Sequence, residues 1–375
     1  MSADLVPAQA RPVTVVVVDD SATQRRFLRA AAEADGDVTV VGEARNGREA
    51  VAMVERLRPS VVLMDLDLPV MTGMEAIERI MAASPTPILV CSGFVEGAAR
   101  SNALEALAAG AVDVLAKPGP ADAGGLDAYA DALRKRLRVA ARVRVITHPR
   151  GRLQRTGEPR RLAGTPGRRP LEAAPPPQRT ATRHVRLIAV GASTGGPQAL
   201  ATVLGGLPAD LDQAVLVVQH MAEGFIPGLA AWLDGLVPMP VLVGASGKRL
   251  APGTVTIAPS GGNLLVQDDR LRVLVTPPDP GQFHVPGIDA TFTSVAAVLG
   301  PAACGVLLTG MGRDGAAGLK LMRERGAVTI GQDEATSAVY GMPAAAYTLG
   351  AVEHQLPIDR IADAVLEVVG RAVAP

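Results

Sequence analysis

Short runs of β-branched and other apolar residues alternate with amphipathic segments over residues 13–142, and this alternation limits the folds open to the chain. The segment between the second and third runs places Ala50, Val51 and Val54 on one face of a helix. Five such strand–helix units predict an α/β domain with a doubly wound parallel sheet, whose functional groups lie at the carboxyl ends of the strands. The expected strands lie at 13–20, 38–44, 61–66, 87–92 and 113–117.

The same alternation returns after residue 185, which predicts a second, mainly parallel α/β domain. Its expected helices include 315–326 and 358–370. Two further apolar runs, 263–267 and 270–276, flank a polar turn and predict a short antiparallel hairpin beside the main sheet. The expected strands lie at 186–193, 214–220, 240–245 and 304–310.

Residues 141–184 break the pattern and are expected to be a linker between domains at 13–140 and 185–372. The stretch 142–183 contains eleven arginines and two glutamates, a formal charge of +9, and too few apolar residues to fold alone. Such a stretch serves either as a solvated basic tether or as a segment that docks on an acidic surface. Residues 1–12 are expected to be disordered.

Composition excludes several classes of protein. Aromatic residues make up 2% of the chain, so stacking platforms for single-stranded nucleic acid are not expected. The two cysteines, Cys91 and Cys304, lie too far apart for a disulfide framework or a cysteine zinc motif, which fits a reducing compartment. No signal peptide is visible, and no uninterrupted apolar run approaches the roughly 18 residues of a membrane helix. We therefore expect a soluble cytoplasmic protein that does not insert into membranes.

Polar residues follow the strands of the first half at their carboxyl ends. Asp19 and Asp20 follow the first strand, Asp65 the third, Ser92 the fourth and Lys117 the fifth. In a parallel sheet these residues converge on one edge, where three carboxylates suit a hard cation such as Mg²⁺. With that cation bound, one carboxylate can attack phosphorus while Lys117 and Ser92 steady the transferred oxygens. A single acidic residue after a strand is often only a cap, but the combination predicts a phosphoryl-transfer site.

A serine lies at the first strand-to-helix corner of the second half. The string Gly191-Ala-Ser193-Thr-Gly195 satisfies the GxSxG pattern of a nucleophile elbow. We expect the backbone N–H groups of Thr194, Gly195 and Gly196 to be unpaired at the helix start and to stabilise an anion. A phosphate-binding glycine turn is the alternative, because short glycine-rich strings are only moderately specific.

A nucleophilic serine needs a base and an acid that orients the base. His220 ends the next strand and is the favoured base, whereas His284 is a loop residue that could line a cleft. Asp314 is the favoured acid, although it is equally placed to cap the following helix. The nearby glycines at 310, 312 and 315 allow close backbone approach, which favours a site. The order Ser, His, Asp differs from that of α/β-hydrolases.

Over residues 13–135 the sequence resembles the receiver domain of two-component response regulators, through VVDDS, MDLDLPVMTG with Asp65, the Ser92 position and AKP. The resemblance implies a flavodoxin-like (βα)₅ fold in which Asp65 accepts a phosphoryl group from a chemotaxis-type histidine kinase. It also implies that Asp19 and Asp20 help to bind Mg²⁺, and that Ser92 and Lys117 form the switch pair. Many receivers carry Phe or Tyr three residues before the lysine, where this chain has Val114.

Over residues 185–370 the sequence resembles the catalytic domain of CheB chemotaxis methylesterases, through GASTGG, VVQHM, PSGGN, FHVPGID and LLTGMGRDGA. The resemblance implies that Ser193 is the nucleophile, His220 the general base and Asp314 the orienting acid, with Thr194 and Met311 beside the oxyanion. No role is assigned to His284. Implied substrates are the methylated glutamates of chemoreceptors, and some glutamines, with no cofactor for the esterase. Open alternatives are a receiver-controlled hydrolase of another protein ester or amide and a non-catalytic binding module.

Overall fold

The computed structural model describes residues 12–93, 105–107, 109–117, 125–143, 184–221, 224–278, 280, 282 and 284–371. The expected disordered segment 1–12 and the expected linker 141–184 therefore lie outside the described residues, apart from their ends. Within the described part, no helix is both long and apolar enough to span a bilayer.

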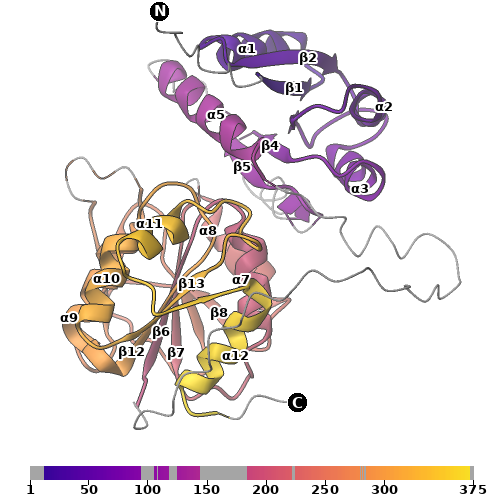
Figure 1. Cartoon of the computed structure of the whole chain (residues 1–375). Coiled ribbons are helices and arrows are strands. Elements are labelled where there is room, and N and C mark those ends of the chain that lie inside the picture. Colours follow the sequence, from indigo (N-terminus) through magenta and orange to yellow (C-terminus); the bar gives the residue numbers. More distant parts are fainter. Residues whose placement is uncertain are drawn as a thin grey trace, which may run out of the picture.

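The first domain is built on a five-stranded parallel sheet with the strand order β2-β1-β3-β4-β5. This order changes direction between β1 and β3, so the carboxyl ends of these two strands flank a crevice in which ligands bind in such sheets. Figure 1 shows this sheet in indigo and magenta. Its strands are β1 (Val13–Val18), β2 (Val38–Ala44), β3 (Val61–Met64), β4 (Ile88–Ser92) and β5 (Asp113–Ala116).

Helices cover both faces of this sheet because successive residues of each strand point to opposite sides. Val15 and Val17 of β1 pack in one buried cluster with residues of α1 and α5, and Val16 and Val18 in another with residues of α2 and α3. The helices are α1 (Ala22–Glu33), α2 (Gly47–Leu57), α3 (Gly73–Ala83) and α5 (Leu126–Ala140).

The second domain is built on a seven-stranded parallel sheet with the order β14-β13-β12-β6-β7-β9-β8. The central strand β6 pairs with β7 on one side and β12 on the other, so the loops that follow these three strands meet at one edge. The strands are β6 (Leu187–Ala192), β7 (Ala214–Gln219), β8 (Val241–Val243), β9 (Val255–Ile257), β12 (Ala303–Leu307), β13 (Val328–Gln332) and β14 (His354–Leu356).

Helices also cover both faces of the second sheet (Figure 1). One buried cluster joins the sheet to α7 (Gly196–Gly205), α8 (Ile226–Asp234) and α12 (Ile358–Val368). The other joins it to α9 (Ile288–Leu299), α10 (Ala316–Glu324), α11 (Met342–Thr348) and the antiparallel pair β10 (Asn263–Val266) and β11 (Val273–Thr276). A short 3₁₀ turn, η1 (Gly300–Ala302), precedes β12. The two parallel sheets and the hairpin confirm the predicted fold class.

Three strands of the second sheet were not among those expected from the sequence. β9 and β14 are three residues long, too short to show a periodic pattern. β13 is longer but ends in Gly331-Gln332, and glycine and glutamine are uncommon inside apolar strands. These strands extend the sheet beyond β7 on one side and beyond β12 on the other. The edge at which the loops after β6, β7 and β12 meet is unchanged.

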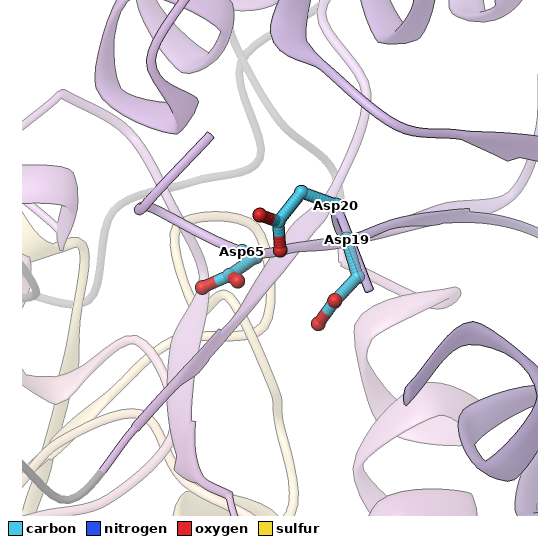
Figure 2. Close-up of side chains that lie close together, drawn as sticks. All are labelled: Asp19, Asp20 and Asp65. Atoms are coloured by element: carbon cyan, nitrogen blue, oxygen red, sulfur yellow. The ribbon is translucent and has the colours of Figure 1, made fainter. Parts of the chain in front are cut away.

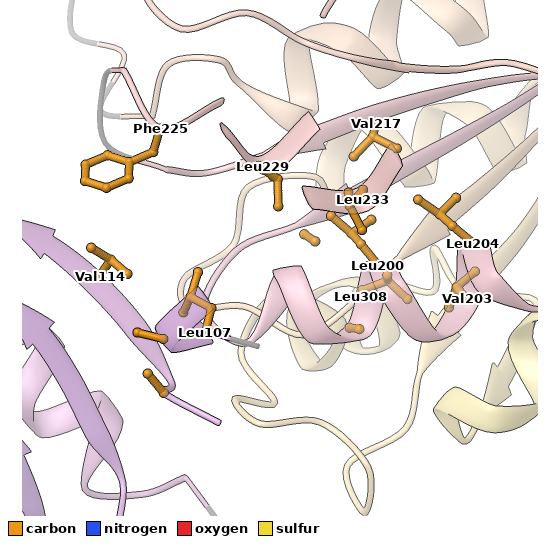
Figure 3. Packing of buried hydrophobic residues seen from close by; sticks show 14 of the residues in the cluster. Leu107, Val114, Leu200, Val203, Leu204, Val217, Phe225, Leu229, Leu233 and Leu308 are labelled. Carbon is orange, nitrogen blue, oxygen red and sulfur yellow. The ribbon is translucent and has the colours of Figure 1, made fainter. Parts of the chain in front are cut away.

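Apolar side chains join the two domains. Leu107 and Val114 of the first domain belong to the same cluster of buried side chains as Leu200 and Phe225 of the second (Figure 3). The Gln198 side chain of α7 also donates a hydrogen bond to the backbone carbonyl of Leu107. The first domain therefore packs against the second through the region of β5 and of residues 105–107.

Candidate functional site

The register of β6 and β7 brings Ser193 next to His220. Ala192 lies opposite Gln219 in the parallel pair, and each strand ends one residue before a predicted site residue. The His220 N–H donates to the carbonyl of Ala192 at 3.0 Å, which continues the ladder beyond the strands. Ser193 is largely buried, at 9% exposure, and it lines one cavity together with His220.

Asp314 contacts His220 directly. The His220 Nε2 lies 2.7 Å from Asp314 Oδ2. Because an ionised carboxylate can only accept, this nitrogen carries the proton and Nδ1 is the basic nitrogen. The buried Nδ1 has no hydrogen-bond partner among the described residues. The imidazole is thus oriented at one nitrogen and available at the other.

The Asp314 carboxylate also accepts backbone hydrogen bonds from Ile288 at 2.8 Å and Asp289 at 2.9 Å. Burial by itself would raise the pKa of Asp314, but the hydrogen bond and charge of His220, together with these N–H groups, lower that pKa to about 2. Asp314 therefore remains ionised at any pH at which proteins ordinarily work.

Asp314 was also a candidate cap for the helix that follows it, α10, but other residues occupy that role. The N-cap of α10 is Gly315, and no side chain caps its first turn from that position. The Asp289 Oδ1 atom accepts the N–H of Gly318, in the first turn of α10, at 2.6 Å. Asp314 Oδ1 does accept the adjacent Gly315 N–H at 3.0 Å, but its other oxygen is directed to His220.

Buried polar side chains that sequence reasoning missed hold the Ser193 loop. The Gln219 amide, 1% exposed, donates to the carbonyls of Ser193 and His220, each at 2.9 Å. The Ser193 N–H donates to the carbonyl of Thr309 at 3.0 Å, and the Thr309 hydroxyl donates to the carbonyl of Thr194 at 3.0 Å. A glutamine at the end of an apolar strand was the available signal, since the N–H groups of a buried amide need acceptors.

Close backbone approach explains one of the glycines after β12. A Cβ atom on Gly310 would lie 2.6 Å from the Ser193 Cβ and 2.4 Å from the Met342 sulfur, so a larger residue would displace the serine. Gly195, after the serine, has a φ of +75° in the left-handed region, and a Cβ there would lie 2.5 Å from Ala338. Both positions therefore require glycine.

The expectation that three N–H groups after Ser193 are unpaired is wrong for Gly196. Its N–H donates to the Ser193 carbonyl at 2.7 Å, because the chain turns tightly before α7. The N–H groups of Thr194 and Gly195 have no hydrogen-bond partner among the residues that the structure describes, nor does that of Met311. Thr194 and Met311 line the same cavity as Ser193. Their two N–H groups therefore form a candidate anion site in this cavity.

This cavity has a volume of about 300 Å³ and is lined by residues of both domains. From the second domain come Ser193, His220 and His284; from the first come Lys135 and Arg136 of α5, among others. The His284 ring stacks on the His220 ring, with centroids 4.4 Å apart and an interplanar angle of 9°. Sequence reasoning assigned no role to His284.

The first domain holds the predicted acidic cluster. One oxygen each of Asp19, Asp20 and Asp65 lies within 4.8 Å of the others (Figure 2). Asp19 and Asp65 are buried, whereas Asp20 is exposed. Three carboxylates, with one side open to water, fit the oxygen ligands that a hard divalent cation prefers.

Lys117 bridges two of these carboxylates, with its Nζ 2.7 Å from both Asp19 Oδ2 and Asp65 Oδ2. Burial lowers the pKa of Lys117, but the hydrogen bonds to the two carboxylates outweigh it and the pKa is raised. For Asp65, burial outweighs the neighbouring lysine, so its pKa lies above the ordinary value. Ser92 ends β4 as expected, and its side chain lies outside the described atoms.

Two family models match the chain. Residues 15–124 match the response regulator receiver domain, and residues 188–365 match the CheB methylesterase domain. A receiver followed by this domain defines a response regulator whose output domain is of the methylesterase class.

Relatives agree with that class over nearly the whole length. The chain is 42% identical over 369 residues to protein-glutamate methylesterase/protein-glutamine glutaminase 3 of Paramagnetospirillum magneticum, covering 98% of this chain and 99% of the relative. It is 43% identical over 358 residues to protein-glutamate methylesterase/protein-glutamine glutaminase 2 of Anaeromyxobacter dehalogenans, covering 95% of this chain and 97% of the relative. The chain belongs to the CheB family of protein-glutamate methylesterases/protein-glutamine glutaminases, which confirms the resemblance seen in the sequence.

The solved structures that match this chain include the crystal structure of the Thermotoga maritima CheB methylesterase catalytic domain. It is 31% identical to this chain, with a TM-score of 0.48, and the match covers 49% of this chain and 99% of that domain.

Proposed function

We propose that this chain is a phosphorylation-activated serine esterase that hydrolyses glutamate γ-methyl esters on the cytoplasmic helices of chemoreceptors, releasing methanol, and deamidates selected glutamines there. The observation that carries the proposal is the 2.7 Å hydrogen bond between His220 Nε2 and Asp314, beside a serine one register position past β6. A phosphate-binding glycine turn needs neither a histidine nor a buried aspartate.

In this mechanism Ser193 Oγ attacks the ester carbonyl while His220 Nδ1 takes the hydroxyl proton. The imidazolium that forms is stabilised by Asp314, which is already ionised because its pKa is about 2. The N–H groups of Thr194 and Met311 face the developing oxyanion, and one such donor typically contributes about 10² to 10³ in rate. His220 then returns its proton to the departing methanol oxygen, and water hydrolyses the acyl-enzyme by the same proton transfers.

The receiver supplies the control. Asp65 accepts the phosphoryl group from a histidine kinase, Lys117 contacts the transferred oxygens, and Ser92 completes the switch pair. The carboxylates of Asp19, Asp20 and Asp65 would hold Mg²⁺, which when bound neutralises negative charge on the phosphoryl oxygens. Lys117 already lies 2.7 Å from Asp65 Oδ2, the group to be phosphorylated.

Control passes through the contact between the domains. Lys135 and Arg136 of α5 line the cavity that contains Ser193 and therefore obstruct the approach of a receptor helix. Val114, where many receivers carry an aromatic ring, is 3% exposed in the cluster that includes Phe225. Phosphorylation of Asp65 would loosen this contact, with β5 and α5 as the elements that move.

The experiment is methanol release from methylated receptor by the wild type, Ser193→Ala and Asp65→Asn, each with and without a small-molecule phosphodonor. We expect faster release by phosphorylated wild type, no stimulation of Asp65→Asn, and a loss of at least about 10³-fold in Ser193→Ala. Release by both the wild type and Ser193→Ala at no more than the uncatalysed background rate would leave the non-catalytic binding module. Release from other acylated proteins but not from methylated receptor would leave a hydrolase of another substrate.

A further inference from the structure

A second histidine lies flat against His220 inside the cavity. The His284 and His220 rings are 4.4 Å apart between centroids and nearly parallel, at 9°. Parallel stacking at this distance is one of the favoured geometries of planar side chains. No step of the proposed esterase mechanism uses His284 as an acid, base or nucleophile, so the contact needs another explanation.

The loop that carries His284 is held in place from both sides. The Gln282 Nε2 atom donates to the His284 carbonyl at 2.6 Å. The Gln282 and Asn263 amides pair with each other at 2.8 and 2.9 Å, and Asn263 Oδ1 also accepts the Gly287 N–H at 2.8 Å. The hairpin strand β10 therefore fixes the backbone from which the His284 ring reaches His220.

His220 needs such a surface because its ring is held at two points only, by the covalent bond at Cγ and by the hydrogen bond from Nε2 to Asp314. A ring held at these two points can still turn about the axis that joins them, and turning changes the direction of Nδ1. A flat neighbour on one face removes this freedom. The position of Nδ1 matters because a misplacement of about 1 Å can cost on the order of 10²-fold in rate.

We propose that His284 is a positioning residue that fixes the ring plane of His220 by stacking and so directs Nδ1 toward Ser193. The proposal rests on the proposed esterase function. His284 acts through His220 and does not exchange protons with the substrate, so a flat uncharged ring is its only requirement.

Burial, together with the charges around His284, keeps the ring neutral. Burial and then the positive charge of His220 lower the pKa of His284, and Lys135 and Arg136 of α5 act in the same direction. The carboxylate of Asp314 opposes them, but the net pKa lies below the ordinary value. At neutral pH the ring therefore presents an uncharged π face to the imidazolium that forms at His220, an arrangement that stabilises the cation.

The test compares His284→Leu, which keeps apolar volume without a flat ring, with His284→Phe, which keeps the ring but has no nitrogen. His354→Leu is the control, because this histidine lies in β14 and does not line the cavity. Methanol release by the phosphodonor-activated full chain gives kcat and KM. We expect His284→Leu to lower kcat about 10-fold or more with KM within about 2-fold, and His284→Phe to restore kcat to within about 3-fold of wild type.

Wild-type kcat in His284→Leu would overturn the proposal. So would a Phe variant as slow as the Leu variant, which would assign proton transfer to His284, or a change confined to KM, which would assign substrate binding. The rate at which a serine-directed phosphonylating reagent labels Ser193 is measured in parallel, since it needs no ester substrate. Absence of methanol release from the wild type, with the Leu and Phe variants still separated in labelling, would contradict the proposed function and leave the role of His284 supported.

Discussion

Each of the two parallel sheets in this chain places an aspartate at its carboxyl edge, and the pKa of that aspartate shifts in opposite directions at the two edges. Asp65 is surrounded by other carboxylates and one lysine, and burial raises its pKa. Asp314 accepts hydrogen bonds from His220 Nε2 and from the backbone N–H groups of Ile288, Asp289 and Gly315, and its pKa falls to about 2.

The difference follows from the groups that surround each carboxylate. The hydrogen bond and charge of His220 lower the pKa of Asp314 most, whereas the charge of Asp19 adds to the effect of burial at Asp65. Backbone N–H groups at the start of α9 point at Asp314 and satisfy its lone pairs, so the carboxylate is stabilised and unreactive. Asp65 keeps one oxygen on the Leu66 N–H and the other on Lys117, and its negative neighbours favour a cation. The same edge of the same kind of sheet therefore makes a permanent orienting charge in one domain and a chemically reactive carboxylate in the other.

Among the changes that test this difference between the two aspartates, Asp314→Asn is expected to have the largest effect on kcat. The amide cannot accept as many hydrogen bonds as the carboxylate, and it cannot stabilise the His220 imidazolium, so kcat for methanol release should fall by about 10³-fold or more. The matched control is Asp289→Asn, where the remaining Oδ1 can still accept the Gly318 N–H. A similar loss in both variants would mean that the loop, and not the Asp314 charge, is what catalysis requires.

The two aspartates should also differ in how they affect stability. Because the pKa of Asp314 is depressed, its stabilisation is complete above the unfolded value near 3.8 and is lost as pH falls through about 2. Hydrogen exchange of the full chain should therefore show the second domain weakening over this acid range, by on the order of 2 kcal/mol. Asp314→Asn should flatten this pH dependence.

For Asp65 the sign reverses, since a raised pKa means that ionising this carboxyl costs more free energy in the folded state than in the unfolded state. Asp65→Asn should slow exchange of receiver amides at neutral pH, where Asp314→Asn speeds exchange in the second domain. Destabilisation of the receiver by Asp65→Asn would contradict the comparison.

A smaller effect is expected at Gln219, which holds the Ser193 loop without touching the reacting atoms. Gln219→Met keeps the volume but removes the amide donor of the Ser193 and His220 carbonyls, of which the Ser193 carbonyl keeps the Gly196 N–H. We expect a loss of about 1 to 3 kcal/mol in the free energy of unfolding and about 10-fold in kcat. Gln198→Met, on the surface of α7 that contacts the receiver, is the control for removal of an amide. An unchanged kcat in Gln219→Met would show that the loop is rigid without this residue.

Much of both sites could be predicted from the sequence. Strand alternation places Asp19, Asp65 and Lys117 at one edge because parallel strands share the direction of their carboxyl ends. The same rule pairs Ser193 with His220. These predictions need only the order of residues along each strand.

What the sequence does not contain is the path of the loops. The bond of Gly196 to the Ser193 carbonyl, the stacking of His284 and the capping of α10 by Asp289 all depend on how loops from distant strands pack together. The pattern around Asp314 fits a helix cap as well as an orienting acid, and only the contact with His220 separates them.

The most direct test is the labelling of the full chain by a serine-directed phosphonylating reagent, with the modified residue located by mass spectrometry. The central claim is that Ser193 is a nucleophile whose accessibility depends on phosphorylation of Asp65. The expected result is labelling at Ser193 that a phosphodonor accelerates in the wild type and leaves unchanged in Asp65→Asn. Labelling at another serine, or a rate at Ser193 that the phosphodonor does not change in the wild type, would contradict the account.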